Sequence, residues 1–398
     1  MRTHPLKDRC CPNRSCVLHG RFGQGNVMVH SFYRTTQGRR RRYRCTQCRR
    51  TFSSTIGTPY YRLHKPQALF DEVSRMSADG VGKSAIARIK RIAWNTAARW
   101  LALAAEFVRR FNDRMLRKVD LHELQADEIR SFLLHKQMEV WIHTVIEVWS
   151  RLWLSVVVGR RTARNIRRSL RDTLERGRFT QRFLLTTDGL DLYERTVSWV
   201  FGFLCIYAQV IKDFRNNRVC RVETRLIRGI QAQLDEALFD SEDSSTVNTS
   251  FVERLNLTIR QGCSYLSRRS AGHARYAEHL DDQMALLQCH YNFIRPHRSL
   301  RLGKEKRTPA WQAGLVSRQL SFREIFLHRL AMLLLLFVCV HVAVRGSGRV
   351  SVGRLTATVA GLNRPTSARS SRAAMRAVRA ASSGPCAGLR RDAGASSS

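Results

Sequence analysis

Three carboxylates in the middle of the sequence have the placement of a metal-dependent phosphodiester site. Asp127 follows an apolar, strand-like stretch, Asp188 ends the segment FLLTTD, and Glu253 lies within NTSFVERLN. In-line attack on a phosphodiester builds negative charge on the entering and leaving oxygens, and two divalent cations about 3.5–4 Å apart can stabilise both. Mg²⁺ prefers oxygen ligands and keeps several waters, so two or three carboxylates are enough. We therefore predict that Asp127, Asp188 and Glu253 are catalytic and bind two Mg²⁺ or Mn²⁺ ions.

The individual positions leave alternatives open. Asp120, Glu123 and Glu128 lie near Asp127 in the sequence and compete with it for the first position. Asp188 precedes a glycine, and this pair could form only a turn. Most acidic residues are solvated or cap helices, so the prediction depends on the three carboxylates acting as a set.

Four cysteines near the N-terminus form two pairs. Cys11 and Cys16 lie in CPNRSC, Cys45 and Cys48 lie in CTQC, and 28 residues separate the pairs. This spacing can bring four thiolates to a tetrahedral Zn²⁺. A bound ion would supply much of the folding free energy of so small a module. We predict a structural Zn²⁺ site; unligated thiols, or Cys10 in place of Cys11, are the alternatives.

A net charge of +38, from 69 Lys and Arg against 31 Asp and Glu, indicates a polyanionic partner. Nucleic acid is the leading candidate, and a solvated basic surface or basic tail is the alternative. The densest basic cluster lies between the two cysteine pairs, and we expect an arginine-rich loop there. Contacts from such a loop to DNA phosphates would position the protein without reading sequence. The arginines are Arg39, Arg40, Arg41, Arg42 and Arg44.

Residues 66–111 have the pattern of three helices. Pro66 can open the first, DGVG at residues 79–82 makes a turn, and Ser84 can cap a second helix that runs to about Lys90. This spacing predicts a helix-turn-helix, although a plain helical linker has a similar pattern. The third helix would be the recognition helix, and the residues that would meet base edges from its start are Asn95, Thr96 and Arg99.

From about residue 121 the pattern changes to that of a mixed α/β sheet. Between residues 212 and 248 it is looser, and we expect an insertion or a mobile loop. We expect Glu253 to lie on a helix that also presents Asn256 and Arg260 on one face. The expected strands are 121–134, 140–148, 152–158, 183–187 and 199–212, with a basic helix at 162–176.

Several ordered motifs together resemble the DDE-class insertion-sequence transposases of bacteria and archaea, specifically the insertion-sequence-one type. The resemblance covers roughly residues 8–315. Besides the cysteine quartet, its motifs are TTDGLDLY (186–193), YAQVIK (207–212), NTSFVERLNLTIRQ (248–261), SRRS (267–270) and YNFIRPHRSL (291–300).

The resemblance implies a transposase that binds the terminal inverted repeats of an insertion sequence and catalyses Mg²⁺-dependent DNA strand cleavage and strand transfer. It implies an RNase H-like catalytic domain with Asp127, Asp188 and Glu253 as its triad. Because two DNA ends must be held together, a homo-oligomer on double-stranded DNA is expected. The residues that would line the site or grip DNA phosphates are Asn256, Arg260, Arg268 and Arg269.

The predicted fold is therefore a multidomain α+β protein. The expected parts are a zinc-ribbon-like DNA-binding module (1–62), a helix-turn-helix (63–115), an RNase H-like mixed α/β catalytic domain (116–302), a C-terminal strap (303–320) and a tail (321–398). The tail combines a 15-residue apolar run, Leu330 to Val344, with a disordered basic stretch, and a shifted reading frame could explain it. That run is shorter than the roughly 20 residues of a membrane span.

The remaining features of the sequence concern location and competing functions. No apolar signal-peptide core follows Met1, and eleven cysteines with only four in paired spacing disfavour a disulfide scaffold. We therefore expect a cytoplasmic, nucleoid-associated enzyme without stable membrane association. The alternative function is a non-catalytic zinc and helix-turn-helix DNA-binding protein, or a decayed transposase that still binds DNA ends.

Overall fold

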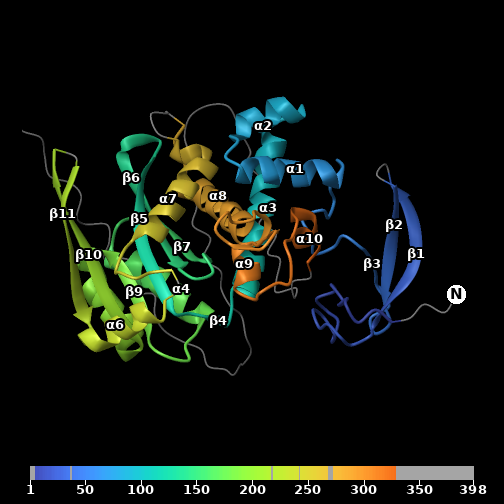
Figure 1. Ribbon diagram of the computed structural model, residues 1–398. Helices are drawn as coiled ribbons and strands as arrows, with labels where there is room; N and C mark the ends of the chain where they lie inside the picture. Colours follow the sequence, from blue (N-terminus) through green and yellow to red (C-terminus); the bar gives the residue numbers. More distant parts are fainter. Residues whose placement is uncertain (1–4, 36–37, 217, 242, 268–271, 329–398) are drawn as a thin grey trace, which may run out of the picture. The chain divides into compact units, whose positions relative to one another are not determined.

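The computed structural model describes residues 5–35, 38–216, 218–241, 243–267 and 272–328. Within these residues the protein is mixed α/β, with ten α-helices and a central six-stranded sheet (Figure 1). A separate three-stranded antiparallel sheet lies in the N-terminal region. Its strands are β1 (Val27–Thr35), β2 (Gly38–Cys45) and β3 (Thr51–Ser53).

The arginine cluster lies on a strand, and the expected loop is wrong. Residues 39–42 and Arg44 belong to β2, which pairs with both β1 and β3. Aromatic side chains on β1 provide the reason, because the arginine stems and guanidinium groups stack across the strand pair. Arg39 lies 4.1 Å from the ring centre of Phe32, and Arg42 lies 5.3 Å from that of Tyr33. Stacking on aromatic faces lets a strand accommodate consecutive arginines.

Three helices follow, as the sequence predicts. They are α1 (Gln67–Ala78), α2 (Lys83–Lys90) and α3 (Trp94–Met115). Pro66 does precede the first helix, but α2 begins at Lys83 after Gly82, so Ser84 is its second residue and not its cap. Gly80 in the turn has φ +87°, and a Cβ there would lie 2.7 Å from the carbonyl oxygen of Gln261. A glycine is therefore required both by the backbone conformation and by this close approach.

The central sheet has the strand order β11-β10-β9-β5-β6-β7. Strand β9 is parallel to both β5 and β10, and the other neighbouring pairs are antiparallel. The strands are β5 (Glu123–Leu133), β6 (His135–Glu147), β7 (Trp153–Gly159), β9 (Phe183–Asp188), β10 (Cys205–Arg215) and β11 (Arg218–Arg228). Short pairs outside this sheet are β4 (Val119–Asp120) with β8 (Gly177–Arg178), and β12 (Arg301–Leu302) with β13 (Glu305–Lys306).

Helices cover both faces of the sheet. Side chains alternate along a strand, and on β5 Leu124 and Ala126 pack in one apolar cluster while Ile129 packs in another. The first cluster includes Ile166 of α4 and Val197 of α5. The second includes apolar residues of α7 and α8. These helices are α4 (Ala163–Arg176), α5 (Asp191–Phe201), α7 (Ser250–Gly262) and α8 (Ala277–Cys289).

Two expectations for this region are wrong. The strand expected at 199–212 begins only at Cys205, because Trp199 and its neighbours end helix α5 and a short 3-10 turn, η1 (Gly202–Leu204), follows. The loop expected at 212–248 is largely ordered and contains strand β11 and helix α6 (Gln231–Phe239). Strand β11 is an exposed edge strand rich in arginine, so it lacks the apolar alternation by which a half-buried strand is recognised.

The chain stays folded past the expected start of the tail at residue 321. Helix α10 (Phe322–Leu327) begins with a capping box between Ser321 and Glu324, and Phe322, Ile325 and Phe326 are buried in the main core.

Residues 329–398, including the apolar run 330–344, lie outside the described residues. None of the helices in the described part of the chain is both long enough and apolar enough to cross a bilayer. The remaining helical elements are α9 (Pro309–Gln312), η2 (Ser264–Leu266) and η3 (His290–Ile294).

The helices α1 to α3 do not have a core of their own. Buried residues of these helices and of the sheet belong to one apolar cluster. Polar contacts also join them to α8, since Arg109 forms ion pairs with Asp281 and Asp282, and Ser77 hydrogen-bonds to Gln283 at 2.8 Å. The helices α1 to α3 and the sheet therefore share one apolar core, and no break in packing marks the boundary expected at residue 115.

Candidate metal centres

Asp127 and Asp188 lie next to each other on adjacent strands. Ala126 of β5 pairs with Thr187 of β9 in a parallel ladder, and the two aspartates are the next residues on each strand. Ligand atoms of Asp127, Glu128 and Asp188 all lie within 4.8 Å of one another. Oxygens on opposite sides of an octahedral Mg²⁺ are about 4.2 Å apart. This group of carboxylates could therefore hold a metal ion with small movements.

Asp127 is fixed by hydrogen bonds to both of its carboxylate oxygens. The backbone N–H of Glu128 donates to Oδ1 at 2.7 Å, and Nδ2 of Asn256 donates to Oδ2 at 2.7 Å. The Oδ1 atom of Asn256 in turn accepts a hydrogen bond from Thr144 at 3.1 Å. Asn256 is only 8% exposed, so its amide is used inside the protein. It therefore lines the carboxylate site and positions Asp127.

Electrostatics at the two aspartates favour binding of a cation. Burial, together with the charges of Asp188, Glu128 and Glu253, raises the pKa of Asp127 to about 7, although the N–H of Glu128 opposes this. Burial and the charge of Glu128 also raise the pKa of Asp188 above its ordinary value. Like charges held this close disfavour each other's ionised form. A divalent cation would reverse that effect, so the carboxylates fit a metal ion.

Glu128 is the third member of the group, and the sequence offered it only as a competitor of Asp127. Its side chain is fully buried, with Arg161 at 3.3 Å and Nδ1 of His143 at 3.7 Å. Burial raises the pKa of Glu128, but His143, Tyr193 and Arg161 outweigh burial and lower it. Arg161 also lies 3.8 Å from Asp188. This arginine, which sequence reasoning missed, therefore links Glu128 to the aspartate pair.

Glu253 lies on the first turn of α7, close enough to affect Asp127 but outside the 4.8 Å group. Its Oε1 accepts a hydrogen bond from Thr249 at 2.8 Å and pairs with Lys212 of β10. Val252, Leu255 and Ile259 anchor the helix in the core, as its periodicity indicates. The sheet and α7 thus bring all three predicted carboxylates to one region, with Lys212 holding the third.

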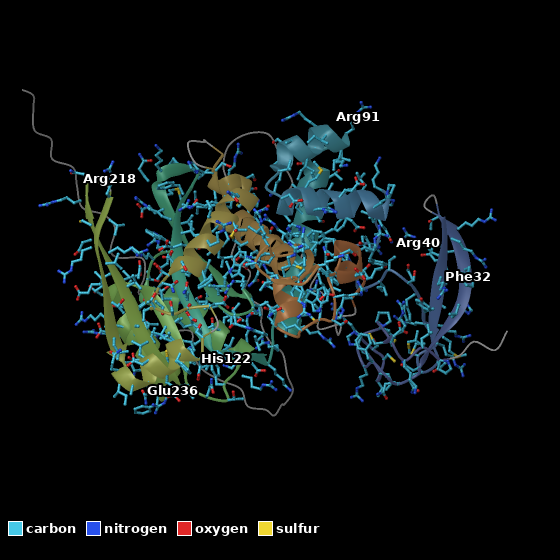
Figure 2. All side chains as sticks on the ribbon, in the orientation of Figure 1. Phe32, Arg40, Arg91, His122, Arg218 and Glu236 are labelled. Carbon is cyan, nitrogen blue, oxygen red and sulfur yellow. The ribbon has the colours of Figure 1, made fainter. Side chains whose placement is uncertain are left out.

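The other acidic competitors are engaged elsewhere. Asp120 of β4 pairs with Arg178 at 2.6 Å, and Glu123 accepts a hydrogen bond from Ser241 at 2.8 Å. Glu123 lines a cavity of about 630 Å³, together with His122 and Glu236, which Figure 2 labels near helix α6. None of the three predicted catalytic carboxylates lines this cavity.

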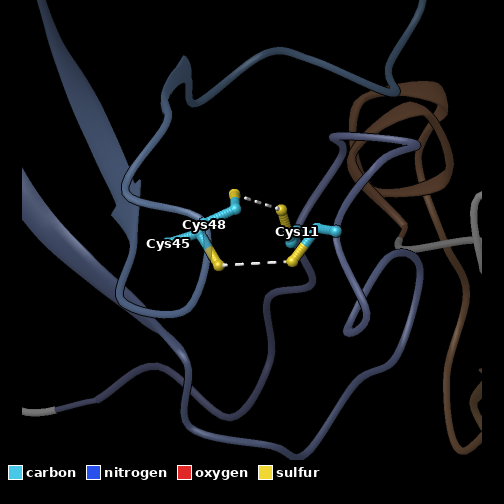
Figure 3. Close-up of side chains that lie close together, drawn as sticks. Cys11, Cys45 and Cys48 are labelled. Carbon is cyan, nitrogen blue, oxygen red and sulfur yellow. Dashed lines mark hydrogen bonds between the residues drawn. The ribbon is translucent and has the colours of Figure 1, made fainter.

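The four predicted cysteines form a compact second centre (Figure 3). The Sγ atoms of Cys11 and Cys48 are 3.5 Å apart, and those of Cys16 and Cys45 are 3.9 Å apart. Tetrahedral Zn²⁺ with Zn–S bonds of about 2.3 Å requires sulfur atoms about 3.8 Å apart. The sulfur positions therefore fit zinc. Cys10 is not a member of this group, so the choice of Cys11 over Cys10 agrees with the structure.

The surroundings of the cysteines are also suited to a metal. Burial raises the pKa of the Cys11 thiol above its ordinary value, which favours the protonated form unless a cation binds. Burial acts in the same direction on Cys48, but hydrogen bonds from Asn13 and the backbone of Arg50 lower its pKa to about 6. Asn26 donates a hydrogen bond to the sulfur of Cys45 at 3.2 Å. Such outer contacts orient the ligands of a metal site.

The residues expected to contact DNA lie in three places. The arginines of β2 stand on the hairpin where Figure 2 labels Phe32 and Arg40. Asn95 and Arg99 are exposed and Thr96 is partly buried on the first turns of α3. Arg260 is partly buried in the last turn of α7. Arg268 and Arg269 lie outside the described residues.

Comparison with known proteins adds no relative: no model of a protein family matches the chain, and no curated protein matches it. The function is therefore inferred from the two centres, the charge of the surface and the motifs of the sequence.

Proposed function

We propose that this protein is a DNA transposase of the DDE class, which binds the terminal inverted repeats of an insertion sequence and catalyses metal-dependent strand cleavage and strand transfer. The observation that carries the proposal is the position of Asp127 and Asp188 side by side on β5 and β9, with Glu253 nearby on α7. Two or three carboxylates in this arrangement suit the hard cations that serve phosphodiester chemistry.

The topology of the sheet supports the proposal. Three antiparallel strands, β5 to β7, are followed by β9 and β10, which add in parallel on the other side of β5. This arrangement agrees with the RNase H-like catalytic domain that the sequence resemblance implies. In this protein, two acidic residues come from the central strands β5 and β9, and the third comes from helix α7, which follows the last parallel strand.

The proposed chemistry assigns distinct tasks to the residues of the site. Asp127, Asp188 and Glu253 would hold the divalent ions, which would stabilise charge on the entering and leaving oxygens of an in-line displacement. Asn256 keeps the carboxylate of Asp127 in one orientation. Arg161 places positive charge beside Asp188, and Lys212 holds the carboxylate of Glu253 near the other two. Preorganised charge of this kind needs little rearrangement during the reaction.

DNA recognition is proposed for the N-terminal parts of the chain. The cysteine centre would hold a zinc-ribbon-like module whose strand β2 presents arginines to DNA phosphates. The helices α1 to α3 would act as a helix-turn-helix, with Asn95 and Arg99 exposed at the start of the recognition helix. Phosphate contacts would give most of the affinity, and contacts of α3 with base edges would give the sequence preference.

The experiment compares the purified protein with the Asp188→Asn variant on a labelled duplex taken from the DNA that flanks the gene, in Mg²⁺. Asp191→Asn is the matched control, because it makes the same change three residues away at an exposed position at the start of α5. Nicking and strand transfer by the wild type and by Asp191→Asn, but not by Asp188→Asn, would support the proposal. Binding of the duplex by all three proteins without cutting would refute catalysis and leave the alternative of a non-catalytic or decayed DNA-binding protein.

A further inference from the structure

Helices α4 and α5 form an exposed surface on which two arginines stack on one tryptophan. Trp199 of α5 is 54% exposed. The guanidinium carbons of Arg167 and Arg171, both on α4, each lie 4.3 Å from the centre of its ring. Residues four apart in a helix are neighbours on one face, so the two arginines reach the same ring from adjacent turns. We call Arg167, Arg171, Trp199 and the adjoining Arg228 the arginine–tryptophan surface.

The arginines of this surface have no carboxylate partner within 4 Å among the residues that the structure describes. The two acids of α4 are used elsewhere, since Asp172 pairs with Arg176 at 2.8 Å and Glu175 with Arg117 at 3.6 Å. The Nε atom of Arg167 is buried and has no hydrogen-bond partner in the described part of the chain. Stacking on Trp199, and not an ion pair, therefore sets the positions of the Arg167 and Arg171 guanidinium groups.

Arg228 extends the surface from the end of β11. Its Nε donates to the hydroxyl of Ser198 at 3.4 Å, and its guanidinium carbon lies 5.6 Å from the ring centre of Phe203. Phe203 is 85% exposed. The guanidinium group of Arg228 therefore lies beside Ser198, the residue before Trp199, and stacks on Phe203. The positive charge of the surface comes from two separate elements, α4 and β11.

The arginine–tryptophan surface is separate from the carboxylate centre. On β5, Asp127 points toward α7, where Asn256 binds it. The neighbouring Ala126 packs in the cluster that contains Val197 of α5. Helices α4 and α5 therefore lie on the face of the sheet opposite to α7, and their outer surface belongs to neither metal centre.

We propose that the arginine–tryptophan surface binds the phosphates of duplex DNA at a second site, apart from the carboxylate centre. Guanidinium groups bind phosphate through paired hydrogen bonds and can stack on an aromatic ring at the same time. The ring fixes the arginines before DNA arrives, so less side-chain entropy is lost on binding. The choice of DNA among polyanions depends on the proposed function, whereas the exposed positive charge and the stacking are features of the structure itself.

The test measures the affinity of the full chain for a duplex of about 40 base pairs in EDTA at several salt concentrations. We expect the double variant Arg167→Gln/Arg171→Gln to bind more weakly and to reduce the slope of log affinity against log salt by about 2, because each phosphate contact contributes roughly one unit. An unchanged slope would overturn the proposal.

The role of the ring is tested without changing any charge. Trp199→Leu removes the stacking surface, and we expect roughly fivefold weaker binding because the arginines must be ordered when DNA binds. Trp199→Phe keeps an aromatic ring and is expected to retain most of the affinity. Equal affinity of wild type and Trp199→Leu would refute the positioning role. Thermal melting of each variant checks that the fold is kept.

A matched charge control separates this surface from general basicity. Arg168 is exposed on the same helix as Arg171 but contacts no aromatic ring in the described structure, so Arg168→Gln makes the same charge change. We expect Arg171→Gln to weaken binding more than Arg168→Gln does. Equal losses would point to nonspecific attraction and overturn the proposal. A change of oligomeric mass in Trp199→Leu with unchanged DNA affinity would also overturn it, in favour of a protein interface.

Failure of this proposal can be told apart from failure of the proposed function. Binding is measured in EDTA, where no metal-dependent cleavage occurs, and Asp188→Asn is included as a second protein. If wild type and Asp188→Asn bind equally and both lose affinity when Arg167 and Arg171 are replaced, the surface is supported even when no cutting is found in Mg²⁺. If cutting occurs but these replacements leave affinity unchanged, only the second site is refuted.

Discussion

The cysteine centre and the carboxylate centre differ in how they relate to the apolar core around them. Cys11, Cys16 and Cys45 form the buried cluster of the N-terminal module, with Leu18, Cys48 and Phe52 packed beside them. Among the described residues up to Ser53, the other buried apolar residues are Val27 and Tyr43. The carboxylate centre lies on a six-stranded sheet that is covered on both faces by large apolar clusters. At the cysteine centre a bound metal ion would supply the folding free energy that a larger apolar core supplies elsewhere. At the carboxylate centre the apolar clusters on both faces hold the sheet together without a metal.

The buried carboxylates therefore destabilise the fold, and the apolar packing around the sheet offsets this loss. Asp127 and Asp188 are held together although burial and the charges of neighbouring carboxylates, Glu128 above all for Asp188, oppose their ionisation. Strain of this kind is typical of functional sites, because the surrounding structure maintains an arrangement that would not form alone. The two centres should consequently respond differently to metal removal, mutation and pH.

Removal of zinc should give the largest effect. Binding of structural Zn²⁺ contributes on the order of 10 kcal/mol to the folding of small zinc modules, so a strong zinc chelator, or Cys16→Ser, should unfold β1 to β3. Hydrogen exchange should show loss of protection in residues 27–53 while β5 and β6 stay protected. Cys10→Ser is the control, because Cys10 is outside the sulfur group. Full protection of β1 to β3 without zinc would refute the difference between the centres.

Replacement of the two glutamates should separate catalysis from stability. Glu253→Gln should reduce Mg²⁺-dependent cleavage roughly 10³-fold or more, in line with the loss of a catalytic group, and leave the melting temperature nearly unchanged. Glu128→Gln removes the buried charge that faces His143 and the exposed Arg161, so it should lower the free energy of unfolding by about 1–3 kcal/mol. The reverse pattern would identify Glu128, and not Glu253, as the third ligand.

Loss of the amide that holds Asp127 should have an intermediate effect. Asn256→Ala leaves Oδ2 of Asp127 without its 2.7 Å hydrogen bond, and changes next to metal ligands typically reduce metal affinity about 10- to 100-fold. The apparent affinity for Mg²⁺ can be measured from the metal dependence of cleavage. Thr258→Ala, at a partly buried position of the same helix whose hydroxyl donates to the backbone of Arg254, should leave it unchanged. Equal metal affinity in all three proteins would show that Asn256 does not position the carboxylate.

The pH should change metal affinity and stability in opposite directions. With a pKa of about 7 for Asp127, a proton competes with the metal below pH 7, so the affinity for Mg²⁺ should fall roughly fivefold from pH 7 to pH 6. In metal-free protein the raised pKa contributes stability that is complete below the ordinary value near 3.8 and is lost as the pH rises through 7.

Thermal melting in EDTA between pH 4 and pH 8 checks the stability part of this prediction. Asp127→Asn should remove the contribution of Asp127, so the melting temperature should change less between pH 4 and pH 8. It should leave the part due to Glu147, whose pKa burial also raises to about 7. A curve that is the same in wild type and Asp127→Asn would contradict the assignment.

Local sequence patterns predicted the elements that have strong local signals. Pro66 and the apolar periodicity marked α1 to α3, and branched apolar residues marked β5 to β7 and β9. The same reasoning was wrong where tertiary contacts override local preference. The strand β2 is stabilised by aromatic partners on β1, and α10 is short but fills the core with Phe322, Ile325 and Phe326. The partners of α10 lie far away in the sequence, since Phe326 packs against Phe70. The aromatic partners of β2 are nearby, but they meet the arginines only through the register of β1 with β2.

The sequence by itself determined the chemistry that is present: two cysteine pairs, a large positive charge and acidic residues at the ends of apolar segments. Residue type and short-range spacing are enough for these features. Only the tertiary structure decided which groups meet. It placed Glu128 and Arg161 beside the aspartates, turned Asn256 inward and brought Trp199 under two arginines. Such contacts depend on strand register and helix packing, which join residues far apart in the chain.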